Sequence, residues 1–210
     1  EFFLDLIFPQ ACVTCDSIGG YVCPSCYKRM RFYDQPLEID ITHPSMDLLL
    51  ACTTYVGTGS ELIQTFKYGS AFDLAATISQ MMKWHIPKPG DVDYLVPVPL
   101  HKKREKDRGF NQAELLAKRL STYWGIPVLK ALSRTKETTP QAELKRENRL
   151  ANLTDAFEMN TVNKKVTLTG KKIVLIDDVA TTGSTLNECA KVLKKNEAKS
   201  VTGIVFAHGD

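Results

Sequence analysis

Several kinds of segment are missing from this chain of 210 residues. No apolar run reaches the ~20 residues that a membrane-spanning helix needs. The apolar start, Phe2–Phe8, carries Asp5 and lacks the basic region that opens a signal peptide. Internal repeats and low-complexity tracts are also missing. The apolar and charged fractions, 43% and 24%, are those of an ordinary globular protein. We therefore expect a cytoplasmic protein without membrane insertion.

Two common phosphate-binding loops are missing as well. No Gly-x-Gly-x-x-Gly follows a strand-like segment, which argues against a dinucleotide fingerprint. No Gly-x-x-x-x-Gly-Lys-Ser/Thr occurs, which argues against a P-loop ATPase. A different pattern occupies residues 171–185. Its apolar run predicts a buried strand that ends in Asp177 and Asp178, followed by a tight hydroxyl-bearing loop and a helix.

The chemistry of this loop suits a phosphorylated sugar. A loop that turns backbone N–H groups inward at a helix N-terminus binds phosphate, and Gly183 lacks the Cβ that would block close approach. The carboxylates of Asp177 and Asp178 repel phosphate but suit sugar hydroxyls or a divalent cation. The alternative is an ordinary strand–turn–helix with exposed acids. The hydroxyl donors are Thr181, Thr182, Ser184 and Thr185.

Six cysteines are present, and four of them form two close pairs near the N-terminus. Two Cys-x-x-Cys pairs in a short, turn-rich segment with few apolar side chains are typical of a structural Zn²⁺ site. The alternative, a redox dithiol, uses one such pair at the start of a helix in a larger fold. Cys52 and Cys189 lie among apolar residues, and we expect both to be buried. The expected zinc ligands are Cys12, Cys15, Cys23 and Cys26.

A basic segment, residues 101–149, holds thirteen Lys/Arg against six Asp/Glu, although the net charge of the chain is only +3. Such a segment attracts polyanions, whether phosphorylated metabolites or nucleic acid. Its first part is a loop suited to a pyrophosphate, in which Arg108 offers a planar fork for bidentate contacts. Gly109 and Asn111 supply the turn and the N-cap of the next helix. The alternative is a solvated basic surface loop.

The later part of the basic segment, residues 134–149, is polar and too long for an ordinary connection in an α/β domain. We interpret it as a functional lid. Arg134 and Lys136 are its candidate cations, and Gln141 is a candidate polar contact. The alternative is a solvent-exposed helix over Gln141–Asn152.

Strand-like and helix-like segments alternate along the rest of the chain. This order predicts a mainly parallel, twisted sheet with helices on both faces, in which ligands bind outside the carboxyl ends of the strands. We expect a four-cysteine zinc-binding segment (1–33), a linker (34–46) and an α/β domain (47–210). The expected elements are strands at 48–56, 94–99, 173–177 and 201–207, helices at 61–68, 73–85, around 113–120 and at 184–195, and a polar loop at 100–111.

The strand, acid pair and Thr-Gly-Ser-Thr185 ending resemble the 5-phosphoribosyl-1-pyrophosphate (PRPP) loop of type I phosphoribosyltransferases. Four further features sharpen the resemblance, and they occur in a fixed order over nearly the whole chain. Together they are similar to the ComF family of bacterial competence proteins. The features are the four-cysteine segment, Phe66-Lys-Tyr-Gly69, Val96-Pro-Val-Pro99 followed by Arg108-Gly-Phe-Asn-Gln112, and Arg134-x-Lys-x-Thr-x-x-Gln141.

The resemblance implies the type I phosphoribosyltransferase fold with a small N-terminal zinc-binding segment, and PRPP with Mg²⁺ as the ligand. It implies that three residues are catalytic: Asp177 and Asp178 hold the ribose hydroxyls with the aid of the metal, and Arg108 stabilises the departing charge. The implied pyrophosphate ligands are His101, Lys102, Lys103, Arg104 and Arg108, and the implied 5-phosphate ligands are Ala180, Thr181, Thr182, Gly183, Ser184 and Thr185.

The resemblance also implies a role in natural transformation, in which single-stranded DNA and other competence proteins, such as a DNA-uptake helicase, are candidate partners. Three alternatives stay open: a PRPP-sensing module without turnover, a DNA-binding or scaffold module, and a phosphoribosyltransferase of nucleotide metabolism. The acceptor of a transfer reaction is not readable from the sequence, and neither is turnover itself.

Overall fold

The computed structural model describes residues 10–35, 44–68, 71–136, 156–160 and 167–209. Over these residues, no helix combines the length and apolar character that crossing a membrane requires.

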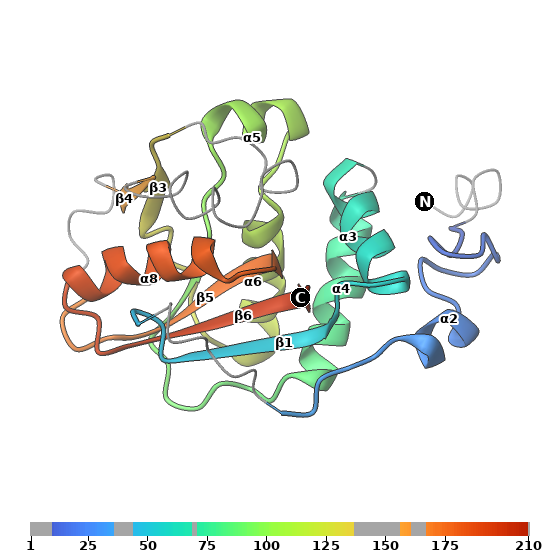
Figure 1. Ribbon diagram of the computed structural model, residues 1–210, viewed down its shortest axis with the longest axis horizontal. Coiled ribbons are helices and arrows are strands. Elements are labelled where there is room, and N and C mark those ends of the chain that lie inside the picture. Colours follow the sequence, from blue (N-terminus) through green and yellow to red (C-terminus); the bar gives the residue numbers. More distant parts are fainter. Residues whose placement is uncertain (1–9, 36–43, 69–70, 137–155, 161–166, 210) are drawn as a thin grey trace.

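A four-stranded sheet forms the centre of the protein (Figure 1). Its order is β1-β6-β5-β2, and every neighbouring pair is parallel. The strands of such a sheet are buried on both faces, which explains the near-continuous apolar runs that predicted them. The strands are β1 (Leu48–Thr54), β2 (Tyr94–Pro97), β5 (Lys172–Ala180) and β6 (Ser200–His208).

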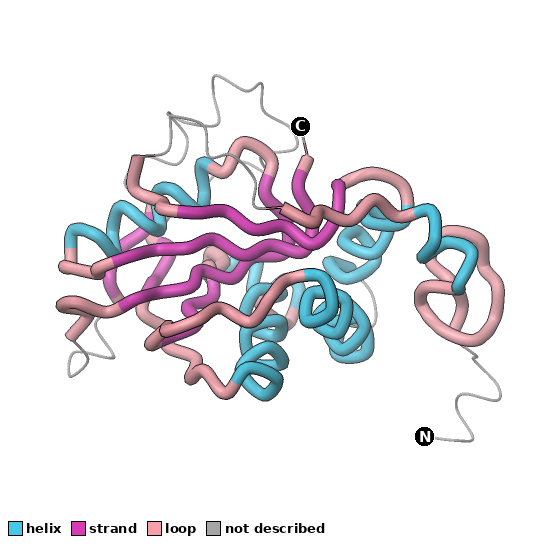
Figure 2. The backbone as a smooth tube through the Cα atoms, turned by 90° about the horizontal axis from the view of Figure 1, so that it is seen from below, coloured by secondary structure: helices cyan, strands magenta, loops and turns pink. Residues whose placement is uncertain are grey.

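Helices cover both faces of the sheet (Figure 2). On one face lies α8 (Ser184–Lys195), whose inward residues Leu186 and Leu193 are fully buried. The other face carries α3 (Thr58–Tyr68), α4 (Ala71–His85) and α6 (Gln112–Trp124). Two separate apolar clusters result, one for each face. The expected fold class is therefore confirmed.

The prediction of a polar loop at 100–111 is wrong in one respect, because this segment contains a helix, α5 (Lys102–Arg108). The backbone N–H of Lys103 donates to Nδ1 of His101, the N-cap, and the helix ends at Gly109, whose φ is +79°. No α5 residue is buried. A helix without a buried face has no apolar period, so the periodicity that identifies the other helices is missing here.

Two short strands were also missed, β3 (Leu132–Arg134) and β4 (Phe157–Met159), which pair antiparallel in a small second sheet. Three residues are too few to show an alternation of apolar and polar side chains. A short helix, α2 (Pro24–Arg29), completes the described elements and lies in the cysteine-rich segment.

The cysteine-rich segment packs against the sheet and its helices. Residues 31–33 pair with the end of β1, where the N–H of Thr54 donates to the C=O of Arg31 at 3.0 Å. The hydroxyl of Thr14 donates to that of Thr58, the first residue of α3, at 3.0 Å. Tyr27 on α2 is 2.7 Å from Nε2 of His85 at the end of α4. The segment therefore contacts β1, α3 and α4 together.

Candidate functional site

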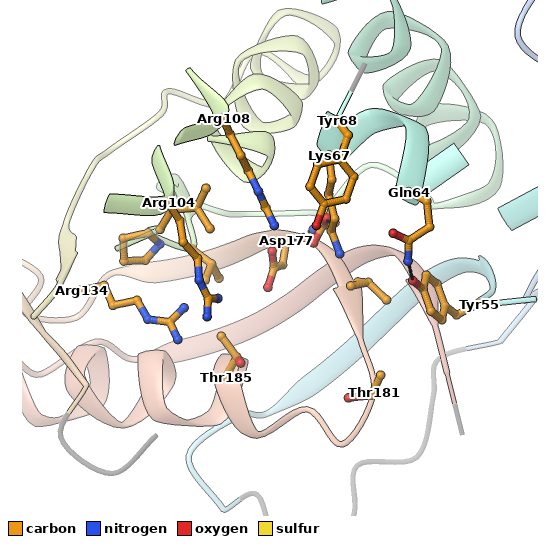
Figure 3. A pocket seen from close by; sticks show the side chains of 15 residues that line it. Tyr55, Gln64, Lys67, Tyr68, Arg104, Arg108, Arg134, Asp177, Thr181 and Thr185 are labelled. Atoms are coloured by element: carbon orange, nitrogen blue, oxygen red, sulfur yellow. Dashed lines mark hydrogen bonds and ion pairs between the residues drawn. The ribbon is translucent and has the colours of Figure 1, made fainter. Parts of the chain in front are cut away.

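A cavity of about 260 Å³ lies at the carboxyl edge of the sheet, where parallel strands present their ligand sites. Segments that are far apart in the sequence meet there: the end of β1 and α3, the turn after β2 with α5, β3, and the end of β5 with the start of α8. Figure 3 shows their side chains pointing toward one another. The lining residues are Tyr55, Gln64, Lys67, Tyr68, Val98, Pro99, Leu100, Arg104, Arg108, Arg134, Asp177, Asp178, Val179, Thr181 and Thr185.

The acid pair forms the floor of this cavity at the end of β5. Asp178 is only 7% exposed, and its Oδ2 lies 3.5 Å from Nζ of Lys67. The backbone N–H of Asp178 donates to Oδ1 of Asp177 at 2.9 Å. Burial, and then the charge of Asp178, raise the pKa of Asp177 well above its usual range. Two crowded carboxylates favour a bound cation, and their oxygens fit the one or two protein ligands that Mg²⁺ takes beside phosphates.

The loop after β5 has the geometry of an anion site. Gly183 adopts φ +72° at the N-cap of α8, and no side chain caps that helix end. The N-terminus of α8 therefore faces the loop with its partial positive charge. Of the six predicted 5-phosphate ligands, Thr181 and Thr185 line the cavity. Ala180 and Ser184 are buried, and the hydroxyls of Thr182 and Ser184 are 2.8 Å apart.

Three arginines also line the cavity, Arg104 and Arg108 from α5 and Arg134 from β3. Burial, and then the charge of Arg104, lower the pKa of Arg134. Two guanidinium groups that disfavour each other's charge in a partly buried place are a strong site for an anion. Nη1 of Arg108 also donates to Oε1 of Gln112 at 3.2 Å, which fixes its direction.

The other predicted basic ligands lie elsewhere. Neither His101, which caps α5, nor Lys103, which is exposed, is among the described residues that line this cavity. Lys102 lines a neighbouring depression. Lys136 is exposed beyond β3, and Gln141 lies outside the described residues. Their roles, and the lid itself, stay predictions.

Four lining residues with polar side-chain groups were not assigned a role from the sequence: Tyr55, Gln64, Lys67 and Tyr68. Lys67 and Tyr68 belong to the Phe66-Lys-Tyr-Gly69 motif, so the sequence marked these two residues but did not indicate what they contact. Their contacts follow from the order of the strands. Because β1 lies beside β6, two strands from β5, the helix that follows β1 reaches the acid pair.

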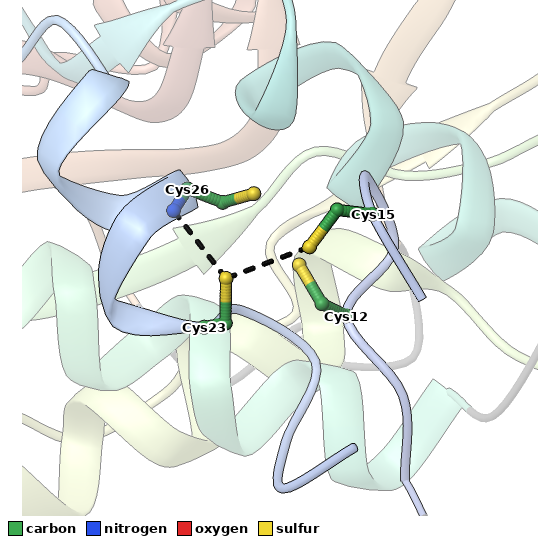
Figure 4. A group of neighbouring side chains, drawn as sticks. All are labelled: Cys12, Cys15, Cys23 and Cys26. Carbon is green, nitrogen blue, oxygen red and sulfur yellow. Dashed lines mark hydrogen bonds between the residues drawn. The ribbon is translucent and has the colours of Figure 1, made fainter. Parts of the chain in front are cut away.

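The four-cysteine cluster is assembled as predicted (Figure 4). All four Sγ atoms lie within 4.8 Å of one another, and a tetrahedral site with Zn–S bonds of about 2.3 Å needs S–S separations of about 3.8 Å. Hydrogen bonds with Ser17 and from the backbone of Cys26 lower the pKa of Cys23 to about 6. Burial and the neighbouring thiols raise the pKa of Cys26 to about 12. A bound zinc ion lets all four sulfurs ionise together.

The remaining cysteines have the predicted environment. Cys52 and Cys189 are fully buried, Cys52 in the core on the face of α3, α4 and α6, and Cys189 in the core under α8. Burial raises the pKa of both thiols, which favours the uncharged form. Both act as small apolar side chains.

Comparison with known proteins agrees with this architecture. The phosphoribosyl transferase domain family matches residues 105–209, and the double zinc ribbon domain family matches residues 3–38. Competence protein F of Haemophilus influenzae is 33% identical over 82% of this chain and 78% of its own. Competence protein ComFC of Bacillus subtilis is 32% identical over 94% of this chain and 83% of its own. DNA utilization protein YhgH of Escherichia coli is 31% identical over 75% of this chain and 70% of its own. The chain therefore belongs to the ComF family, with a phosphoribosyltransferase-like domain and an N-terminal zinc ribbon.

Proposed function

We propose that the cavity binds PRPP together with Mg²⁺, and that the protein acts on DNA during natural transformation. One observation carries the first part: the acid pair, the loop at the start of α8 and three arginines converge on a single cavity of about 260 Å³. The four basic and two acidic side chains that line it leave an excess of positive charge for a doubly phosphorylated sugar.

Each part of PRPP has a matching group of residues in the cavity. The 5-phosphate lies in the loop Ala180–Thr185 at the N-terminus of α8, and the ribose hydroxyls bind Asp177 and Asp178. The pyrophosphate lies against Arg104 and Arg108, with Arg134 next to Arg104. An anion between these guanidinium groups removes their mutual destabilisation, so binding is favoured beyond simple contact.

The reaction supported by this arrangement is displacement of pyrophosphate from C1 of the ribose. The C1–O bond breaks, its electron pair leaves with the pyrophosphate, and the acceptor's lone pair forms the new bond. Arg104 and Arg108 stabilise the departing negative charge, while the ionised acid pair stabilises positive charge that develops on the ribose. Mg²⁺, when bound, neutralises charge on the leaving group.

The role in DNA uptake rests on the family. Two of the relatives are named as competence proteins and a third as a DNA utilization protein. From these names we infer that the protein handles incoming single-stranded DNA and that PRPP binding serves this role. A pyrophosphate-release assay distinguishes turnover of PRPP from sensing of PRPP.

Calorimetric titration of the zinc-loaded protein with PRPP, with and without Mg²⁺, tests the proposal. We expect Mg²⁺-dependent binding that Asp178→Asn weakens by at least about tenfold, equivalent to about 1.4 kcal/mol. Asp91→Asn is the matched control, because Asp91 pairs with Lys172 at the opposite end of β5. No binding by the wild type, or equal binding by both variants, would contradict the proposal.

A pyrophosphate-release assay with bases, amines and DNA ends as acceptors follows. Release that depends on an acceptor identifies a transferase. PRPP binding without pyrophosphate release in the presence of any of these acceptors identifies a PRPP sensor.

A further inference from the structure

A second, larger cavity of about 430 Å³ lies between the cysteine-rich segment and α4. In Figure 1 the cysteine-rich segment, drawn in blue, stands at the end of the molecule beside α3 and α4. The cavity shares no lining residue with the one that holds the acid pair. Its volume is in the range of ligand-binding pockets in proteins. We call it the α2–α4 groove, after the two helices that form its sides.

One side of the groove is a single face of α4. Thr77, Gln80, Met81 and Trp84 follow one another at intervals of three or four residues, so they lie on the same face of the helix. Ile78, which packs in the core, belongs to a different face. Met81 is only 4% exposed, whereas Trp84 is 61% exposed. The helix therefore carries a second apolar face, whose largest side chain is open to a ligand.

The other side of the groove comes from the cysteine-rich segment, which contributes Val22, Pro24 and Tyr27. The hydroxyl of Tyr27 is 2.7 Å from Nε2 of His85, at the end of α4. The Phe32 ring stacks on the His85 ring, with the ring centroids 3.6 Å apart and the planes 2° from parallel. These contacts hold α2 in place against α4. The groove is therefore preformed, and its shape depends on the folded zinc-binding segment.

The charge of the groove comes from one residue, since Lys28 is the only ionisable cation or anion of the lysine, arginine, aspartate or glutamate kind among its described lining residues. Lys28 is exposed and forms no ion pair within the described part of the chain. A lysine at an apolar groove without a neighbouring carboxylate in the lining attracts an acidic group of a ligand. An exposed tryptophan beside buried apolar side chains suits an aromatic side chain of that ligand.

Single-stranded nucleic acid also stacks on exposed aromatic residues, but it needs several cations along its path. The described lining of the groove offers one. The neighbouring cations in the chain have other partners: Nζ of Lys83 lies 4.8 Å from the centroid of the Tyr123 ring on α6, and Nη2 of Arg29 donates to Sγ of Cys26 at 3.0 Å. A single lysine in an apolar groove favours a protein segment over a polyanion.

We propose that the α2–α4 groove binds a segment of a partner protein that carries an aromatic side chain with an acidic residue beside it. The aromatic side chain packs against Trp84 and Met81, and the carboxylate pairs with Lys28. Burial of one aromatic side chain in a pocket of this kind gives an interface its central anchor. The proposal does not depend on PRPP binding, so it can be tested separately.

Fluorescence anisotropy with labelled synthetic peptides, on the zinc-loaded protein, tests the proposal. The probe is a short peptide that combines aspartate with phenylalanine. One control peptide has alanine in place of phenylalanine, and the other has asparagine in place of aspartate. We expect the probe to bind at least about tenfold more tightly than either control peptide. Tryptophan emission gives a second readout, because Trp84 is exposed while the other tryptophan, Trp124, is 4% exposed.

Two substitutions in the groove should each weaken binding of the probe at least about tenfold: Trp84→Ala and Lys28→Glu. Phe72→Ala is the control for the first, because Phe72 is 67% exposed near the start of the same helix and does not line the groove. Lys195→Glu is the control for the second, because Lys195 is exposed at the end of α8, on the other face of the sheet. Both controls should bind the probe as the wild type does.

Several results would overturn the proposal. They are failure of the wild type to bind the probe, equal binding of the three peptides, and probe binding that neither Trp84→Ala nor Lys28→Glu weakens. Binding of oligothymidylate in place of the probe, weakened by both substitutions, would assign the groove to single-stranded nucleic acid instead. Tighter binding of a peptide with the sequence of residues 1–9 would assign it to a segment of this chain.

Discussion

Asp177 should make the protein less stable at neutral pH, so removing its charge should stabilise the fold. Burial and the charge of Asp178 raise its pKa, so the folded protein holds this proton more tightly than the unfolded chain does. The contribution to stability is therefore complete below the ordinary Asp pKa of about 3.9 and is lost as the pH rises through the raised value. Asn cannot ionise, so Asp177→Asn avoids this loss, while its amide oxygen can still accept from the N–H of Asp178 at 2.9 Å.

Single substitutions that stabilise a protein commonly contribute about 0.5–2 kcal/mol, and we expect Asp177→Asn to stabilise the ligand-free protein by about 1–2 kcal/mol at pH 8. For a chain of this length, that raises Tm by about 2–8 °C. Thermal unfolding of the zinc-loaded protein between pH 4 and pH 8, followed by circular dichroism, measures the difference. The gain should shrink toward zero at pH 4, where the wild-type carboxyl is protonated.

Lys67→Met is the matched variant, for which we expect the opposite change in Tm at pH 8. Lys67 lowers the pKa of Asp177 and pairs with Asp178, so its loss should reduce Tm at pH 8 and matter less at pH 4. A lower Tm for Asp177→Asn at pH 8, or a gain that is undiminished at pH 4, would refute the reasoning. PRPP binding should fall in the Asp177→Asn variant even as Tm rises, because the cation and the ribose hydroxyls lose a ligand.

Four further outcomes are expected. Removing zinc with a chelator should lower Tm and weaken PRPP binding, because the zinc-binding segment contacts β1, α3 and α4; calorimetry before and after readdition of zinc checks this. Gly59→Ala should destabilise the protein by about 1–3 kcal/mol, since its Cβ would lie 2.5 Å from the Thr54 carbonyl oxygen. Gly57→Ala, where φ is +52° and space is open, should cost only about 1–2 kcal/mol. Asn111→Ala should cost about 1–3 kcal/mol in urea unfolding, because it removes the α6 cap and the hydrogen bond to the Val98 carbonyl.

The elements that the sequence predicts well carry their signal locally. The helix expected at 184–195 has those bounds, because its buried residues recur at helical spacing and Gly183 marks its start. The acid pair and the loop at residues 180–185 are contiguous, so their chemistry could be interpreted without knowing the fold. The cysteine cluster was predictable for the same reason, since spacing alone brings the sulfurs together.

The features that sequence reasoning missed depend on the order of the strands. Nothing near Lys67 in the chain indicates that it meets Asp178, because that contact exists only when β1 lies two strands from β5. Arg134 was expected in a lid, yet its position at the end of β3 is set by pairing with β4, more than twenty residues away. The basic helix α5 escaped detection because its side chains face solvent and the cavity instead of the core.

The pairing of residues 31–33 with β1 has a further consequence for the sheet. β1 and β2 are its outermost strands, and an outermost strand with free N–H and C=O groups is a template for pairing with another molecule. Phe32 bridges to Thr53 on one outer strand, and Val128 bridges to Leu95 on the other. Phe32 pairs near the carboxyl end of β1, and Val128 pairs near the middle of β2. The cysteine-rich segment therefore also opposes self-association of the sheet. A chain shortened to its phosphoribosyltransferase-like part would leave the N–H and C=O groups at the carboxyl end of β1 without these partners.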